Sequence, residues 1–582
     1  MRRFVLLAAA ASCLLLTGCA SGGGGSTGSG GTSTPPPPPP PANQTLKQAL
    51  TSSTNLVNDA ASLHVALQLP AGTAQTGASG SPTLTVHYDA PSGTYTLTMA
   101  SGSESFGPTD HAASDSASVS RYLKPNSDNL ILVSASAYSG KGYTYGGMAA
   151  WQQNATTGSV QDTTFTTFAY GLESPAGAIP RTGAARFDID VLGAITEPGE
   201  APLYIGGPGN LDVDFASGVF SLGATTKETD LGSGASTTGA IYLTGSGHLS
   251  GSGPNFSGVS SWDGTLSLGG PMEGRFYGPN GEEVGGSFSG SDSRGGTMAG
   301  SFYGAQSTQP PPFNLTLTHL IANQRLGGPG ALLQTGNGPV SYPYGGDVQV
   351  NTDGSFTFYP FLSNETPTPF TEADKVASTR PNFTTYQTTV SGGSSNVAQP
   401  TTIERYNVGP SNTELALTYT TFGIWRQNND EPYNETDTVF YSYGILTPKT
   451  IVQHLTGQGH YAGVVYGEAV DGSTAQQFDL KGATTFDVNF SNQSFTSSFN
   501  LDGTGLKGAP NRNFGSFNAA GQITFDGTPA AVTQAGTKVG TLNLDFHGPL
   551  AEEIAAGFNI QIPGAEIVHP NILVGVMAAK KN

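Results

Sequence analysis

Cysteine is nearly absent from this chain. Its 582 residues include two cysteines, Cys13 and Cys19, and both lie close to the N-terminus. The rest of the chain has no thiol, which excludes disulfide bonds, cysteine nucleophiles, redox-active cysteine pairs and zinc–thiolate sites there. The domains must therefore be stabilised by their cores alone, which large β domains achieve more readily than small ones.

Charged residues are also few, and one sign dominates. They make up 11% of the chain, with 23 basic and 42 acidic residues and a formal net charge of −19. Removal of Arg2 and Arg3 with an N-terminal leader would leave 21 basic residues (23 − 2) and a net charge of −21. This excess of negative charge argues against a nucleic-acid partner. It favours either a basic protein ligand or simple solubility at an anionic cell surface.

Long apolar runs are confined to the N-terminus. Residues 5–16, VLLAAAASCLLL, follow two arginines as the core of a signal peptide does, and no later run approaches the roughly 18 residues of a membrane-spanning helix. The following residues, LTGC at 16–19, resemble the lipobox of bacterial lipoproteins. This resemblance implies a signal peptide at 1–18 and permanent lipid anchoring through Cys19. The alternative is an ordinary secretory signal in which Cys19 merely follows the cleavage site.

Residues 19–42 have the composition of a tether. A Gly/Ser-rich run is followed by consecutive prolines at 35–41, which joins a flexible segment to a stiffer one. Ala20 and Ser21 lack the aspartate that retains lipoproteins of this kind at the inner membrane. The sequence therefore predicts a lipid-anchored protein of the outer membrane whose domains are exposed at the cell surface.

The rest of the chain contains a tandem duplication. The segment GRFYGPNGEEVGGSF at 274–288 returns in altered form as DFHGPLAEEIAAGF at 545–558. Other motifs recur at nearly the same offset of about 274 residues, as a true repeat requires. The matched positions are Tyr145 with Tyr419, Trp151 with Trp425, residues 211–215 with 486–490, Gly278-Pro279 with Gly548-Pro549, and Gly300 with Gly575.

Strands are expected almost throughout. The 81 glycines separate short runs in which apolar and polar residues alternate, as in ARFDIDVLG at 185–193. There Phe187, Ile189 and Val191 would face a core, and Asp188 and Asp190 would face solvent. Many short strands of this kind indicate a sandwich or a barrel. The best helix candidate is a short one within residues 43–67.

No grouping of residues has what a catalytic or metal site requires. Residues 24–28 fit the pattern G-x-S-x-G but lie in the tether. The carboxylate pairs Asp188/Asp190 and Asp212/Asp214 would either bind a cation or form a solvated barrel face. His454 and His460 lack the spacing of metal ligands. The sequence predicts no enzymatic activity, no metal site and no cofactor.

The repeated segment resembles the barrel motif of the transferrin-binding protein B family, a family of bacterial surface lipoproteins. The resemblance implies an all-β fold of two tandem lobes, each a β-rich handle domain followed by an eight-stranded antiparallel β-barrel. The residues that carry it are Gly274, Arg275, Phe276, Tyr277, Gly278, Pro279, Glu282, Glu283, Gly285, Gly286, Ser287 and Phe288, with Gly548, Pro549, Glu552 and Glu553 in the second copy.

This resemblance also sets the expected domain boundaries. The boundaries are a signal peptide at 1–18, a lipidated tether at 19–42, an N-lobe handle at 43–165, an N-lobe barrel at 166–305, a Pro-rich linker at 306–312, a C-lobe handle at 313–440 and a C-lobe barrel at 441–582. Trp151 and Trp425 occupy equivalent places near the handle–barrel boundary, which favours core packing between handle and barrel over contact with a ligand.

The motif itself predicts structure rather than binding. Gly278-Pro279 sets a tight turn, and the small residues Gly285 and Gly286 would let the next strand bend into barrel closure. The second copy has His547 in place of Tyr277, and alanines at 555 and 556 in place of the two glycines. No ligand-binding residue is identified.

The resemblance implies a function of capture and transfer. A member of the family holds an iron-loaded host protein at the cell surface and passes it to a TonB-dependent outer-membrane receptor. Related lipoproteins bind other host proteins, haem or haem carriers, so the predicted partner is a host iron-binding protein or haem carrier. The alternative is a structural or adhesive surface lipoprotein with no discrete ligand.

Overall fold

The computed structural model describes most of the chain downstream of the tether. The described residues are 45–46, 50–112, 118–126, 128–335, 338–360, 367–391, 398–429, 435–563 and 570–582. The predicted signal peptide, Cys19 and the tether lie outside them. The chain divides into two compact units, Met1–Pro310 and Pro311–Asn582, called here the N-lobe and the C-lobe.

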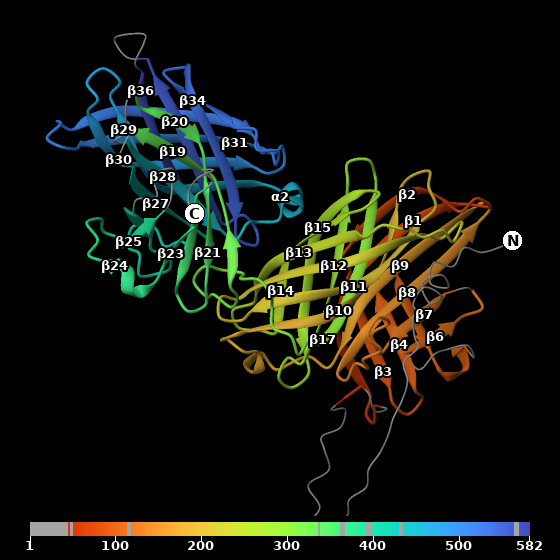
Figure 1. Ribbon diagram of the computed structural model, residues 1–582. Coiled ribbons are helices and arrows are strands. Elements are labelled where there is room, and N and C mark those ends of the chain that lie inside the picture. The colour runs from red at the N-terminus through yellow and green to blue at the C-terminus, as the bar shows by residue number, and fades with distance from the viewer. Residues whose placement is uncertain are drawn as a thin grey trace, which may run out of the picture. The chain divides into compact units, whose positions relative to one another are not determined.

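The N-lobe handle is one antiparallel sheet (Figure 1). Its strands run in the order β5-β4-β3-β1-β9-β8-β7-β6, and β2 also pairs with β1. They are β1 (Thr54–Gln68), β2 (Thr73–Gly80), β3 (Thr85–Asp89), β4 (Thr94–Met99), β5 (Gly102–Phe106), β6 (Val119–Leu123), β7 (Asn129–Val133), β8 (Gly146–Thr157) and β9 (Val160–Gly171).

The helix predicted within residues 43–67 is wrong, because β1 occupies most of that segment. In β1, Leu63 and Val65 are buried while His64 between them is exposed, which is the period of a strand. β1 pairs with β9 over the whole stretch from Val57 to Gln68. These backbone pairs with a distant segment outweigh the local helix preference.

The N-lobe barrel is closed by pairing of its first and last strands. Its interior is filled by apolar side chains that include Phe187, Ile189 and Phe276. It is therefore a packed core without an open channel. The strands are β10 (Ala184–Thr196), β11 (Leu203–Asp214), β12 (Val219–Asp230), β13 (Ile241–Leu249), β14 (Asn255–Asp263), β15 (Ser267–Tyr277), β16 (Glu283–Ser291) and β17 (Thr297–Gln306).

The C-lobe handle consists of two sheets. One has the order β18-β21-β22-β23 and the other β20-β19-β28-β27-β26-β25-β24. Their strands are β18 (Gln324–Leu326), β19 (Gly330–Thr335), β20 (Val340–Pro343), β21 (Gly346–Val350), β22 (Phe356–Pro360), β23 (Thr368–Phe370), β24 (Lys375–Val376), β25 (Phe383–Ser391), β26 (Ala398–Tyr406), β27 (Thr420–Asn429) and β28 (Glu435–Gly444).

The C-lobe barrel is a second closed barrel, with β29 paired to β36. Its strands are β29 (Gln458–Val470), β30 (Gln477–Asn489), β31 (Ser494–Gly505), β32 (Arg512–Gln522), β33 (Ala530–Gln534), β34 (Thr537–His547), β35 (Glu553–Ile562) and β36 (Asn571–Lys581). The described helices are short: α2 (Lys449–His454) and 3-10 turns at Pro108–Asp110, Ala176–Ala178 and Glu372–Asp374.

The predicted all-β fold of two tandem lobes, each with a handle and an eight-stranded barrel, is confirmed. The division between lobes falls inside the expected linker at 306–312. The expected handle–barrel boundaries at 165/166 and 440/441 instead cut β9 and β28, which are handle strands. The barrels begin at Ala184 and Gln458.

In the N-lobe, the handle sheet packs one face against the barrel wall. Leu63 and Phe165 of the handle share a buried cluster with Leu192 and Tyr303 of the barrel. Trp151 lies on the opposite face of the sheet, in the core of the handle itself, and Trp425 takes the same place in the C-lobe. The predicted burial of both tryptophans is confirmed, but their predicted place between handle and barrel is wrong.

Candidate functional site

The repeated motif joins the handle to the barrel in the N-lobe. Glu283, the first residue of β16, is buried, and its carboxylate accepts the backbone N–H groups of Thr144 at 2.6 Å and Tyr145 at 2.9 Å. The Tyr303 hydroxyl donates to the same carboxylate at 2.8 Å. Burial raises the pKa of Glu283, and the hydrogen bonds oppose that rise.

The C-lobe repeats this joint. The carboxylate of Glu553 is fully buried and accepts the backbone N–H groups of Thr418, Tyr419 and Thr420 at 2.7, 2.8 and 3.0 Å. Lys580 lies 3.7 Å away and supplies a positive charge. Burial raises the pKa of Glu553 as well. Each lobe thus uses one motif glutamate to hold the start of a handle strand against its barrel.

The Gly-Pro turn of the motif meets the same joint. Gly278 and Gly548 have φ of +88° and +90°, a conformation that favours glycine. A Cβ atom on Gly548 would lie 2.7 Å from the Tyr419 ring, and one on Gly278 would lie 2.6 Å from the Tyr145 ring. The two tyrosines matched by the repeat are thus the residues that cover the two turns.

The first motif glycines of β16 also permit close packing. A Cβ on Gly285 would come within 2.4 Å of the Tyr303 ring and 2.7 Å of the Ala169 side chain in the handle. A Cβ on Gly286 would lie 2.3 Å from the Glu273 carbonyl oxygen. The small size of these residues therefore lets neighbouring strands approach at the joint.

An ion-pair cluster completes the N-lobe joint. Arg275 of β15 donates to Asp59 of β1 at 2.6 and 2.8 Å and to Glu173 at 2.8 Å. The Arg275 and Asp59 side chains are 16% and 7% exposed, so the pair is shielded from water. A two-pronged guanidinium–carboxylate contact of this kind fixes orientation as well as distance.

The C-lobe lacks this cluster. In the aligned motif Asp545 takes the position of Arg275. The strand pairing gives the C-lobe positions that correspond to Asp59 and Glu173. In the N-lobe Gly146 pairs with Gly171 of β9, and in the C-lobe Thr420 pairs with Gly444 of β28. Residues of β9 therefore correspond to residues of β28 at an offset of 273 (444 − 171). Glu173 then corresponds to Leu446, and each forms a bridge to the motif strand.

Asp59 corresponds to Pro329 by the same register. Asp59 lies opposite Ala169, and Pro329 accepts the N–H of Ser442, which is the residue 273 positions after Ala169 (442 − 169). A guanidinium between two carboxylates in the N-lobe is therefore replaced in the C-lobe by a carboxylate between a proline and a leucine.

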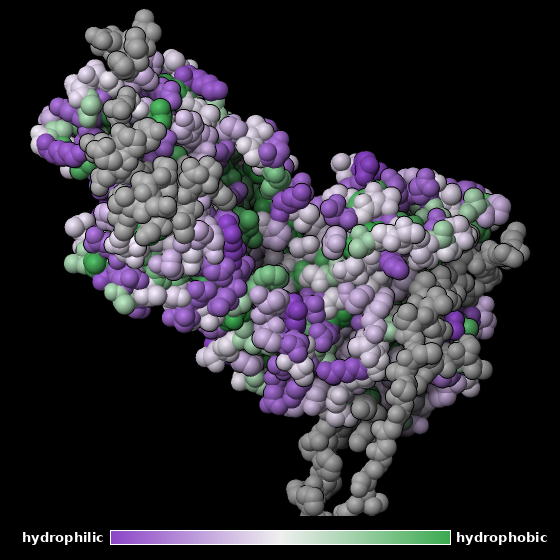
Figure 2. All heavy atoms as spheres, viewed as in Figure 1, coloured by the Kyte–Doolittle hydropathy of each residue, from purple (hydrophilic) through white to green (hydrophobic). Residues whose placement is uncertain are grey.

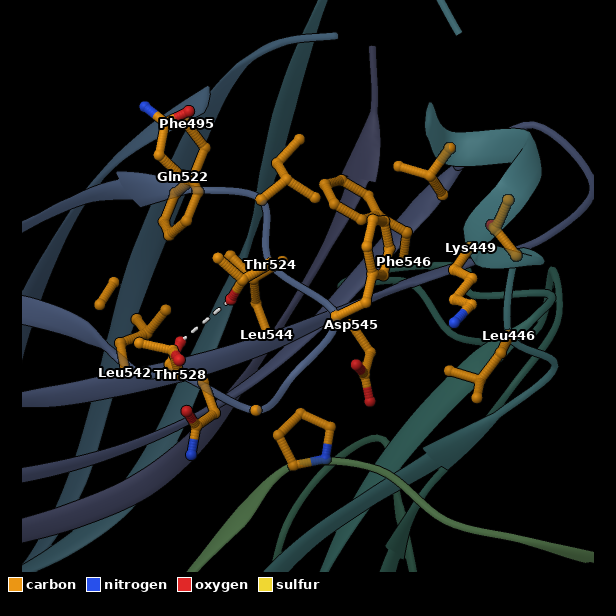
Figure 3. A pocket seen from close by; sticks show the side chains of 18 of the residues that line it. Leu446, Lys449, Phe495, Gln522, Thr524, Thr528, Leu542, Leu544, Asp545 and Phe546 are labelled. Atoms are coloured by element: carbon orange, nitrogen blue, oxygen red, sulfur yellow. Dashed lines mark hydrogen bonds between the residues drawn. The ribbon is translucent and has the colours of Figure 1, made fainter. Parts of the chain in front are cut away.

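A cavity of about 550 Å³ lies at this place in the C-lobe, and all three replacements line it. Figure 3 shows the Asp545 side chain pointing into it, with Lys449 and Leu446 on the side of α2. Figure 2 shows hydrophobic atoms in a recess of the C-lobe beside α2. Other walls are Val452, Phe495, Phe525, Leu542, Leu544 and Phe546.

Asp545 is the unusual group of the cavity. Burial raises the pKa of its carboxyl, and no described residue offers it a hydrogen bond or an ion pair. Lys449, exposed at the start of α2, is the only basic residue among the described residues of the lining. The sequence analysis missed this site, although the exchange of Arg275 for Asp545 within the aligned motif is a charge reversal that could have indicated it.

The aspartate pairs do not form a cation site. Asp190 was expected to face solvent, but it is buried and accepts hydrogen bonds from Ser136 Oγ at 2.9 Å and the Ala137 N–H at 2.6 Å. Burial raises its pKa to about 6. This expectation is wrong because the handle covers that face of β10. Asp188 remains exposed and accepts a hydrogen bond from Asn210 at 3.0 Å.

The second pair is also occupied by protein groups. Asp212 forms a two-pronged ion pair with Arg186 at 2.7 and 2.9 Å. Asp214 is buried and accepts hydrogen bonds in the turn after β11, from the Ala216 N–H at 3.0 Å and Ser217 Oγ at 2.7 Å. Both carboxylates therefore stabilise the barrel wall.

His454 and His460 make separate contacts with protein groups. His460 contacts Asp487 on the neighbouring strand, and His454 Nδ1 is 2.8 Å from the Thr450 carbonyl oxygen in α2. Nowhere in the described parts of the chain do three His, Cys, Asp or Glu residues come together as metal ligands would. Within the same residues no helix has the length and apolarity needed to cross a membrane.

Several solved structures are similar to this chain. A double mutant of transferrin binding protein B from Haemophilus parasuis is 13% identical, with 90% of this chain and 94% of that chain covered and a TM-score of 0.27. Isotype 1 transferrin binding protein B from serogroup B Neisseria meningitidis is 16% identical, with 76% and 86% covered and a TM-score of 0.22. The N-lobe domain of lactoferrin binding protein B of Moraxella bovis is 14% identical, with 42% and 99% covered and a TM-score of 0.20.

No family model matches this sequence, and no curated protein does.

Proposed function

We propose that this protein is a lipid-anchored lipoprotein of the bacterial outer-membrane surface that captures a host iron-binding protein or haem carrier and passes it to an outer-membrane receptor. It performs no chemistry of its own. Cys19 carries the lipid, and residues 19–42 set the reach of the two lobes from the membrane. The TonB-dependent receptor is the partner that the family resemblance implies.

The observation that carries this proposal is the duplicated handle–barrel joint. The motif residues that resemble the family barrel motif form the joint in both lobes, through Glu283 in one and Glu553 in the other. A joint held by buried hydrogen bonds makes each lobe one rigid support. A rigid β scaffold that presents loops is the arrangement expected of a protein that binds a large ligand.

The net charge of −19 supports a protein partner with a basic surface. Opposite charge accelerates encounter and favours the correct partner over acidic competitors. Because charged residues make up only 11% of the chain, the effect would be spread over the surface and would weaken as salt is added.

Anchoring is tested by metabolic labelling with palmitate in the producing bacterium. Wild-type protein should take up label and resist extraction by high salt, and a Cys19→Ser variant should do neither. Addition of protease to intact cells should degrade the two lobes if they face the medium. Labelling that survives in Cys19→Ser would contradict the assigned lipid site.

Capture is tested by pull-down with the purified protein against iron-loaded and iron-free transferrin, lactoferrin, haemoglobin and the producing organism's own envelope extract. Residues 43–310 and 311–582 are used in parallel, since each lobe has its own cores and closed barrel. Saturable retention of an iron or haem protein by one lobe would support capture and locate it. Retention of envelope components alone would instead favour a structural or adhesive role.

A further inference from the structure

We propose that the C-lobe cavity beside α2 is a binding site for an organic cation, a guanidinium or primary ammonium group on an apolar stem, with Asp545 as its counter-ion. The proposal does not depend on capture of an iron protein. It rests on the comparison between the two copies of the handle–barrel joint.

In the N-lobe the corresponding position of the joint is occupied by a side chain of the protein itself. Its occupant is the Arg275 guanidinium, which donates to carboxylates on both sides at 2.6 to 2.8 Å. The pKa of Arg275 is raised above its ordinary value by its contacts with Asp59 and Glu173. A buried cation with satisfied hydrogen bonds is thus an established part of this joint.

In the C-lobe both carboxylates of the N-lobe cluster are lost, and the position of its cation, Arg275, is taken by the carboxylate of Asp545. Asp545 projects into the cavity, and no described residue pairs with it. The Asp545 side chain is half-buried, so its carboxylate loses part of its hydration without gaining a hydrogen bond from the described residues. A cation entering from outside would supply the missing interaction at the place where the N-lobe has its own.

The replaced neighbours define the rest of the ligand. Pro329 and Leu446 take the places of Asp59 and Glu173, so the second charge-binding position has become apolar. Phe495, Leu542 and Leu544 extend this apolar surface. One negative charge in an apolar wall suits a single cationic group joined to a hydrocarbon stem, and about 550 Å³ is within the usual range for small-ligand sites.

Lys449 is the competing cation. It lines the same cavity, is exposed, and forms no ion pair with any described residue. If it turned inward it would neutralise Asp545. The two cations would then exclude each other, so removal of Lys449 should strengthen binding of an added cation.

The test is titration calorimetry of the purified full-length protein with butylguanidinium, butylammonium and the neutral butylurea. Both cations should bind with one-to-one stoichiometry, and butylurea should bind at least tenfold more weakly. Asp545→Asn should reduce cation affinity at least tenfold, and Lys449→Ala should increase it. The matched control, Asp502→Asn, removes an exposed carboxylate from the same barrel and should leave affinity unchanged.

A double variant tests whether a cation supplied by the protein itself prevents binding of an added cation. Pro329→Asp with Asp545→Arg rebuilds the N-lobe pair inside the C-lobe, and it should abolish cation binding while it leaves the protein folded by circular dichroism. Absence of cation binding by wild-type and Lys449→Ala protein at millimolar concentration would overturn the proposal. So would cation affinity that is unchanged in folded Asp545→Asn.

A further experiment distinguishes two sources of the cation, an arginine side chain of a protein partner and a small free molecule. A short peptide with one arginine between leucines is compared with free butylguanidinium. Tighter binding of the peptide through Asp545 would assign the site to an arginine side chain of a protein partner. Equal or weaker binding of the peptide would assign it to a small free cation.

Discussion

Glu553 accepts the backbone N–H of Tyr419 at 2.8 Å, and Glu283 accepts that of Tyr145 at 2.9 Å. Each pair joins residues more than 130 positions apart in the chain. The tyrosines match each other in the duplication, and so do the glutamates. The duplication therefore copied a tertiary contact as well as a pattern of strands, and the contact holds a handle to a barrel in each lobe.

Loss of the C-lobe contact should destabilise that lobe alone. Glu553→Ala leaves three N–H groups without an acceptor, two of them buried and that of Thr418 half-buried, and we expect a loss of about 3–5 kcal/mol. Trp425 is the only tryptophan of the C-lobe, so fluorescence during urea unfolding in a background of Trp151→Phe and Trp262→Phe reports on it. The N-lobe transition, followed by Trp151 and Trp262 in a background of Trp425→Phe, should not move.

The turn glycine of the C-lobe should be intolerant of a side chain. Gly548→Ala adds an unfavourable φ and close contacts with the Glu552 carboxylate and the Tyr419 ring, so we expect a loss of about 3 kcal/mol or more. Gly508 has nearly the same φ, +88°, and open space around it, so Gly508→Ala isolates the backbone effect at about 1 kcal/mol. Equal losses in the two variants, measured by urea unfolding, would show that the contacts with Glu552 and Tyr419 are unimportant.

The N-lobe ion pair should contribute measurably, because it is shielded from water. Arg275→Leu leaves Asp59 buried without its cation, and we expect a loss of about 3–5 kcal/mol. A double-mutant cycle with Asp59→Asn should give a coupling of about 1–3 kcal/mol. Arg294, 63% exposed beside Asp292, is the control, and Arg294→Gln should change stability by less than about 0.5 kcal/mol.

His547 should make C-lobe stability depend on pH. Burial lowers its pKa from 6.5 to about 3, so the folded protein favours the neutral ring. Its contribution is complete above pH 6.5 and is lost as pH falls toward 3, by up to about 1.4 kcal/mol per pH unit. Glu553 and Asp545 have raised pKa values and contribute in the opposite direction, with stability lost as pH rises.

A variant separates the histidine from those carboxyls. His547→Phe should remove the contribution of the histidine to the pH dependence of the unfolding free energy and leave that of the carboxyls. The difference in unfolding free energy between variant and wild type therefore reports the histidine alone. Among the described residues the His547 ring has one polar contact, with the Ile445 backbone, and it falls short of good hydrogen-bond geometry, so the variant should fold. A difference in unfolding free energy that stays constant between pH 4 and 7 would contradict the assignment.

Several features were predictable because they depend on local periodicity and on repetition. Alternation at 185–193 placed Phe187 and Ile189 in a barrel core, where the structure has them. The constant offset between copies indicated two lobes, and the division between them falls in the expected linker. Gly278-Pro279 indicated a tight turn, since few other residues tolerate its backbone conformation.

Other predictions were wrong where contact with a distant segment of the chain determines the structure. Residues 54–67 have the local features of a helix, but pairing with β9 makes them a strand. Asp190 has the alternation of a solvent-facing residue, but the handle lies over that face. Trp151 and Trp425 were correctly placed inside, yet the face of the sheet that holds them depends on which side the barrel covers.

The sequence by itself determined that this is a duplicated β protein with a turn motif shared between copies, because strand alternation depends on neighbouring residues and a repeat is visible by comparing the chain with itself. Only the tertiary structure decided that Asp545, Pro329 and Leu446 line one cavity and correspond to an ion-pair cluster in the other lobe. Those three residues are more than 90 positions apart at their closest, and strand pairing and chain reversal alone bring them together.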